Sequence, residues 1–293
     1  IAFRSLRMSS NTSTSIFLRD PDPDEGLFSE EIFEDFPGGY MTVFSEHGIV
    51  VAERYYDEEK MASLDGIPVP ASQEDLRDTL YVPHVVLFQG AKTFLNLIYG
   101  GEEATTVTLT LTGDQGVPLA PAVVREMEPG SSFREDVAEL FELVEQENAL
   151  TGWILIESTN RGIVGNVEIQ LSERAMTALL AQDTPLRNFV FSHFIQGSGL
   201  STGIALVNPG TVAATVQIEV RRSDGSLVDS LSLPLGPGER EVGLLKGLFP
   251  DLPDLGSGYI EVISDQDLIS LELLFRDDLE FLAAVPPRPI DSQ

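Results

Sequence analysis

The strongest constraint in the sequence is a repeat with a period of 108 residues. Phe33, Phe141 and Phe249 stand at equivalent places, each 108 residues from the next. Residues 152–158 match residues 258–264, each with a glycine, an aromatic residue and alternating apolar residues that end in serine. Self-similarity at a fixed long period is typical of one structural unit copied along a chain. The sequence therefore predicts repeated modules rather than unrelated domains.

The repeat divides the chain into three predicted modules, of which the first is incomplete. They span residues 1–79, 80–186 and 187–293, and the last ends in a proline-rich tail. Ile1 aligns without a gap onto Ile218, so the first module lacks a counterpart of the first two strands of the third. Those strands either lie upstream in a longer gene product or come from a neighbouring molecule, and the sequence leaves both open. Because the chain opens on isoleucine and not methionine, we expect a mature or trimmed fragment.

The local pattern of the modules predicts an all-β fold. Residues 105–112 alternate threonine with apolar residues, which places Val107, Leu109 and Leu111 on one face of a half-buried strand. Glycine-containing turns, such as residues 113–116, separate strands of this kind. Short strands in units of about 100 residues are typical of β-sandwiches.

One short helix is expected to interrupt the strands of each module. Ser132 and Glu135 have the spacing of a capping box, which predicts a helix beginning there. The apolar stripe that follows is expected to lie on the sandwich, with the recurring phenylalanine as a core anchor. In the second module the stripe consists of Val137, Leu140, Phe141 and Val144. Its counterparts are Leu244, Leu245, Leu248 and Phe249 in the third module and Leu27, Phe28, Ile32 and Phe33 in the first.

The modules resemble a known type of β-sandwich. Residues 81–84 and 191–193 give an aromatic-to-histidine opening, residues 202–208 read Thr-Gly-Ile-Ala-Leu-Val-Asn, and a Pro-Gly turn follows at 209–210. With the Gly-Tyr strand at 258–264, this order resembles the roughly 100-residue immunoglobulin-like modules of secreted and surface proteins of bacteria. The resemblance implies an adhesive, scaffolding or filament-forming part and brings no catalytic residue.

Charge and composition narrow the function classes. The chain has 47 Asp and Glu against 18 Lys and Arg, a net charge of −29, which argues against nucleic-acid binding because phosphate requires a cationic surface. The chain contains no cysteine, which excludes disulfides and thiol nucleophiles. It has no apolar run of the length that a membrane span needs. We expect a secreted, extracellular or cell-surface protein whose partners are further copies of itself or other surface proteins.

An acidic segment in the first module is the one candidate metal site. Asp20, Asp22 and Asp24 alternate, and Glu31 stands at the twelfth place, a pattern that resembles a calcium-binding loop. It departs from that pattern at Glu25, where the turn glycine belongs. A solvated acidic turn is the alternative, and calcium is the only cofactor that the sequence suggests.

The candidate catalytic residue is Ser201, in a G-x-S-x-G motif at residues 199–203. A nucleophile elbow needs a helix after the serine, but residues 204–207 read as a strand. We therefore predict no catalytic residue and no enzyme. His84 and His193 share a repeat position, which indicates neutral imidazoles bonded to the backbone at a module junction; His47 carries no assigned role.

Two functions remain after these exclusions. The first is a non-enzymatic extracellular structural protein that builds a filament or surface assembly, with strand complementation of the first module as one route. The alternative is a carbohydrate- or protein-binding adhesin module of a larger secreted protein. Trp153 and Tyr259 share a repeat position with Tyr40, which predicts core residues. The aromatic candidates for binding are accordingly Tyr55, Tyr56 and Tyr99.

Overall fold

The computed structural model describes residues 41, 43, 52–57, 60–65, 76–87, 90–143 and 150–290, with the backbone alone for 52–57 and 60–65 and for residues 256–257. The chain forms two units, residues 1–46 and 47–293, and all that follows concerns the second. There, β1 (Ala52–Asp57) and β2 (Lys60–Asp65) pair as an antiparallel hairpin. Of the predicted first module, the structure describes only this hairpin and residues 41, 43 and 76–79. Its helix, His47 and the calcium candidates Asp20, Asp22, Asp24 and Glu31 lie outside the described residues.

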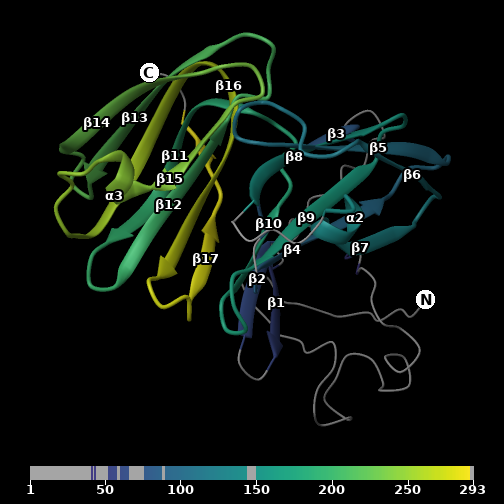
Figure 1. Cartoon of the computed structure of the whole chain (residues 1–293), viewed down its shortest axis with the longest axis horizontal. Coiled ribbons are helices and arrows are strands. Elements are labelled where there is room, and N and C mark those ends of the chain that lie inside the picture. The colour runs from purple at the N-terminus through teal and green to yellow at the C-terminus, as the bar shows by residue number, and fades with distance from the viewer. Residues whose placement is uncertain are drawn as a thin grey trace, which may run out of the picture. The chain divides into compact units, whose positions relative to one another are not determined.

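Residues 79–180 form two antiparallel four-stranded sheets, which we call the first sheet pair (Figure 1). One sheet has the order β3-β8-β5-β6 and the other β10-β9-β4-β7. The strands are β3 (Thr79–Leu87), β4 (Lys92–Tyr99), β5 (Thr105–Thr112), β6 (Val123–Met127), β7 (Ser132–Asp136), β8 (Leu150–Ser158), β9 (Ile163–Gln170) and β10 (Met176–Leu180).

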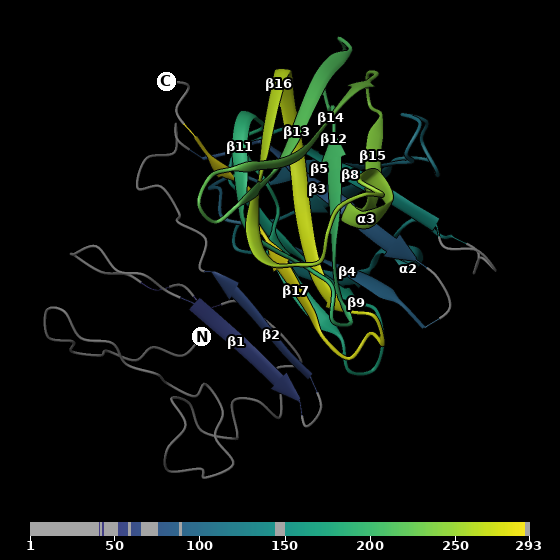
Figure 2. The same ribbon diagram turned by 90° about the vertical axis from the view of Figure 1, so that its left-hand side faces the viewer.

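Residues 186–289 form the second sheet pair, in which one long strand belongs to both sheets (Figure 2). β16 (Leu255–Arg276) has 22 residues. Its first half pairs with β11 and β13, and its second half pairs with β12 and β17. The other strands are β11 (Leu186–Gln196), β12 (Leu200–Val207), β13 (Ala214–Arg222), β14 (Leu227–Leu235), β15 (Arg240–Leu244), β17 (Leu282–Val285) and β18 (Arg288–Pro289).

The two sheet pairs have the same strand order once the halves of β16 are set against β8 and β9. β3-β8-β5-β6 then corresponds to β11-β16-β13-β14, and β7-β4-β9-β10 corresponds to β15-β12-β16-β17. One side-chain contact recurs in both. The Thr93 hydroxyl accepts from the Val86 N–H and donates to the Val86 carbonyl at 3.1 and 2.9 Å, and Thr202 does the same with Ile195 at 3.0 and 2.7 Å. The predicted all-β class is confirmed.

The alternating residues fill the space between the sheets as the sequence predicts. Val107, Leu109 and Leu111 on β5 are fully buried, and Phe141 and Phe249 are 4% and 2% exposed. Complete burial of such a side chain contributes about 1.5–3 kcal/mol. In both pairs the buried cluster contains residues from both sheets, so each pair has its own core.

The predicted capping box at Ser132 is wrong. Residues 132–136 form β7, in which Ser132 pairs with Ile98 and Asp136 pairs with Phe94. The backbone groups of these residues form hydrogen bonds to β4, so the helix begins only after residue 136. α2 (Val137–Leu140) is a single turn capped by Asp136, whose carboxylate accepts from the Ala138 N–H at 2.9 Å.

The matching turn in the second pair is α3 (Leu245–Leu248). Its first residue, Leu245, is fully buried, and Phe249 follows directly after its end. Leu244, which the sequence assigned to the stripe, is instead the last residue of β15 and is 49% exposed. Val144 lies outside the described residues. Among the helices that the structure describes, none has the length and apolar character that a bilayer crossing requires.

Candidate functional site: the junction between the sheet pairs

The outer face of one sheet of the second pair is apolar and packs against the first pair. Leu271 on β16 is 1% exposed and belongs to the same buried cluster as the core of the first pair. Trp153 on β8 packs with Val207 and Ile269 of the second pair. Trp153 is therefore buried at the junction. The sequence had suggested instead a core position inside its own sheet pair. Figure 1 shows the two pairs side by side.

Arg240, the first residue of β15, extends from the second pair into the first. Its side chain is fully buried. Nε and Nη2 donate to the Asp114 carboxylate at 3.0 and 2.5 Å, and Nη1 donates to the carbonyls of Gly152 and Pro83. Nη1 also lies 3.0 Å from Nδ1 of His84. Asp114 is the counter-ion of a guanidinium that the rest of the junction removes from water.

These contacts fix the protonation state of His84. Arginine has no acceptor, so Nδ1 must accept and the ring proton resides on Nε2. Burial, and then the charge of Arg240, lower the pKa of His84 to about 3. The imidazole is therefore neutral at the junction, and its partner is a side chain rather than the backbone. His193, at the same repeat position, is exposed.

Further hydrogen bonds cross the junction at separate points. The Trp153 indole donates to the Gly238 carbonyl at 3.0 Å. Gln182, in the segment between the pairs, accepts from the Ser270 N–H at 3.1 Å and donates to the Ser270 carbonyl. The Ala284 N–H donates to the Thr177 hydroxyl at 2.9 Å. Hydrogen bonds therefore join the two pairs at several points besides Arg240, in addition to the apolar contact.

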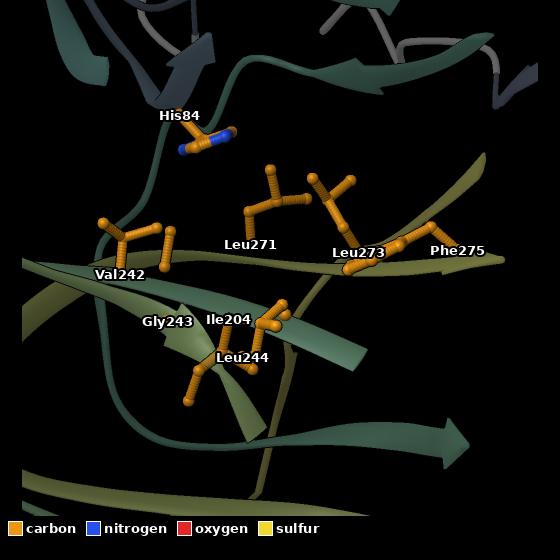
Figure 3. A pocket seen from close by; sticks show the side chains of 10 residues that line it. His84, Ile204, Val242, Gly243, Leu244, Leu271, Leu273 and Phe275 are labelled. Atoms are coloured by element: carbon orange, nitrogen blue, oxygen red, sulfur yellow. The ribbon is translucent and has the colours of Figure 1, made fainter. Parts of the chain in front are cut away.

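A cavity of about 250 Å³ opens beside these contacts. Figure 3 shows His84 of β3 at one side and the side chains of β15, β12 and β16 at the other. The described lining residues are His84, Gly203, Ile204, Ala205, Val242, Gly243, Leu244, Leu271, Leu273 and Phe275. The cavity is thus apolar, with a single imidazole.

Glu272 is a buried ionisable residue that the sequence reasoning did not single out. Its side chain is fully buried, and neither carboxylate oxygen has a hydrogen-bond partner in the described structure. Burial raises its pKa to about 9, so the group is protonated at neutral pH. When residues 268–274 are aligned with residues 163–169, Glu272 takes the position of Val167, which is a core residue. This equivalence is the sequence signal that would have indicated a buried Glu272.

Ser201 lies on β12, and the strand continues to Val207 with no helix after the serine. Its hydroxyl donates to the exposed Asp277 carboxylate at 2.7 Å. The geometry is therefore that of a strand residue at a sheet surface, as the motif's context suggested.

The Ser201→Ala variant is expected to change the free energy of unfolding by less than about 0.5 kcal/mol, because an exposed hydroxyl bond contributes little. Urea denaturation of the two proteins checks this. A loss of more than about 2 kcal/mol would show that the Ser201–Asp277 bond supports the fold.

Of the remaining sequence candidates, only Tyr99 has a described side chain. Tyr99 is 1% exposed and donates to the Glu103 carbonyl at 2.6 Å, so it offers no surface to a ligand. The side chains of Tyr55 and Tyr56 lie outside the described residues. Within residues 76–87, 90–143 and 150–290, no three His, Asp or Glu side chains are grouped as metal ligands.

Similarity of this chain to known proteins is found among solved structures. No protein-family model matches the chain. No curated protein matches it either. Among solved structures it is similar to Thermotoga maritima 1070, with a TM-score of 0.32 and 13% identity over 37% of this chain and 95% of that one. Bacteroides uniformis beta-glucuronidase 2 gives a TM-score of 0.17 and 12% identity over 73% of this chain and 26% of that one. A putative beta-galactosidase from Bacteroides fragilis gives 0.16 and 11% over 73% and 33%.

Proposed function

We propose that the chain is a non-enzymatic extracellular structural protein, built from tandem immunoglobulin-like modules, that serves as a stiff element of a filament or surface assembly. The observation that carries the proposal is the junction. Two sheet pairs of the same strand order meet through a buried apolar face that Arg240 and Trp153 reinforce.

A spacer needs a stiff junction between its modules, and modules joined by a flexible linker do not have one. Domains in one chain move relative to each other unless their interface is large and apolar. The segment between β10 and β11 has five residues, and Gln182 within it pairs with Tyr81 through backbone bonds of 2.8 Å in both directions. The first part of the segment is therefore bonded into the fold, since the Ala181 N–H also donates to the Gly165 carbonyl at 3.0 Å.

The acidic surface and the repeat support the rest of the proposal. A net charge of −29 keeps separate molecules apart until a specific contact forms. The predicted first module, residues 1–79, supplies that contact if its missing strands come from a neighbour, because an incomplete sheet offers unpaired backbone groups. If the strands lie upstream instead, assembly uses complete modules.

Electron microscopy of the full chain tests the proposal, and we expect filaments or sheets. Single particles at every concentration and ionic strength would contradict it, and saturable binding on a glycan array would then favour the adhesin alternative. Intact mass of native material decides the route: about 30 further N-terminal residues, the length of two sandwich strands and their turns, would exclude completion by a neighbour.

A further inference from the structure

The cavity at the junction owes its space to small residues on β12. When β12 is aligned with β4 through Thr202 and Thr93, Gly203 and Ala205 take the positions of Phe94 and Asn96. A Cβ on Gly203 would meet its nearest atom, in the ring of Phe275, at 3.6 Å, which is ordinary contact. Crowding therefore does not require glycine at this position. The small side chains leave open a volume that larger ones occupy in the first pair.

The cavity contains one hydrogen-bond donor in an apolar lining. His84 is 7% exposed and is the only polar side chain among the described lining residues (Figure 3). Because Nδ1 accepts from Arg240, Nε2 carries the proton, and no described residue accepts from it. The Nε2–H is therefore available to a ligand's acceptor, in a lining that has no other polar side chain among the described residues.

The surrounding charges exclude an ionised ligand. Arg240, the cation beside the cavity, already donates to Asp114, Gly152, Pro83 and His84. An anion would enter the apolar lining without a free cation to pair with, and a cation would find no carboxylate among the lining residues.

We propose that this cavity binds a small, uncharged, largely apolar molecule that carries one hydrogen-bond acceptor, which the Nε2–H of His84 recognises. A cavity of 150 Å³ in another protein holds benzene. The volume of about 250 Å³ here suits an aryl ketone or a compound of similar size.

Calorimetric titration of the full chain with three probes tests the proposal. Acetophenone is expected to bind with a Kd of about 1 mM or lower. Propylbenzene, which has the same bulk but no acceptor, is expected to bind about fivefold more weakly. Benzoate is expected not to bind. Non-saturable titration with acetophenone, or equal binding of benzoate, would overturn the proposal.

Two variants locate the binding. Gly203→Val fills the cavity and is expected to weaken acetophenone binding at least about tenfold. Gly247→Ala changes an exposed glycine of α3 outside the lining and is expected to bind as the parent does. Methyl chemical-shift changes of Leu271 and Leu273 in the parent protein provide a readout that does not depend on a variant folding. Unchanged binding by a folded Gly203→Val protein, or shifts confined to other methyls, would place the ligand elsewhere.

Discussion

The Glu272→Gln variant is expected to be more stable than the parent by about 3 kcal/mol at pH 7. The carboxyl of Glu272 has a pKa of about 9 in the fold and 4.5 as its ordinary value. The folded state therefore binds a proton that the unfolded state releases, and the stability that this proton provides is complete below pH 4.5. It is lost as the pH rises toward 9, and each unit costs about 1.36 kcal/mol.

The pH dependence separates this effect from a simple change in packing. Between pH 7 and 8.5 the unfolding free energy of the parent is expected to fall by about 2 kcal/mol more than that of Glu272→Gln. The comparison starts at pH 7 because, at lower pH, His84 changes the unfolding free energy in the opposite direction. With its pKa lowered to about 3 from 6.5, His84 adds stability as the pH rises through that interval.

Urea denaturation of both proteins at the two pH values measures the difference. Glu272→Val is the matched variant, since it restores the residue type of Val167, and it should stabilise at least as much as glutamine. Equal pH slopes for parent and glutamine variant would show that Glu272 is ionised in the folded protein.

Replacing Arg240 with methionine is expected to lower the unfolding free energy by about 3 kcal/mol or more. Methionine keeps much of the apolar contact, but the carbonyls of Gly152 and Pro83 and the Nδ1 of His84 lose their donor. Each buried acceptor left unpaired costs about 1–3 kcal/mol. Asp114 is about half exposed, with 44% of its side chain accessible, so water compensates part of its loss.

Arg187→Met provides the control for this change. Arg187 pairs with Asp267 at 2.9 Å, with both side chains more than half exposed, and a surface pair of this kind contributes at most about 1 kcal/mol. Urea denaturation gives the two costs, and amide exchange shows where protection is lost. For Arg240→Met the loss should centre on residues 113–116 and 152–153. Equal costs for the two variants would contradict the role assigned to Arg240.

The parts of the fold that follow from local pattern could be predicted. The alternation at residues 105–112 gives β5 with its buried face, and the 108-residue spacing gives the shared burial of Phe141 and Phe249. The start of α2 could not be predicted. Ser132 has the residue type of a helix cap, but its pairing with Ile98 on a distant strand determines its conformation.

The sequence placed His84 at a module junction, but it could not identify the partner Arg240, because the two residues meet only in three dimensions. Arg240 and Asp114 are 126 residues apart, and nothing local to either distinguishes a buried ion pair from an exposed charge. Burial at the junction also explains the different environments of His84 and His193. Equivalent places in a repeat have equal surroundings only where the neighbouring unit is the same.

β16 has a mechanical consequence for the second sheet pair. In the first pair, a turn at residues 159–162 separates the strands that serve the two sheets, whereas β16 runs through both without a break. A force applied to either end of β16 therefore acts on both sheets, because the strand is hydrogen-bonded in each of them. Neither sheet can separate from β16 while the other sheet stays intact. Mechanical unfolding of the second sheet pair should accordingly occur in a single step, without a partly unfolded intermediate.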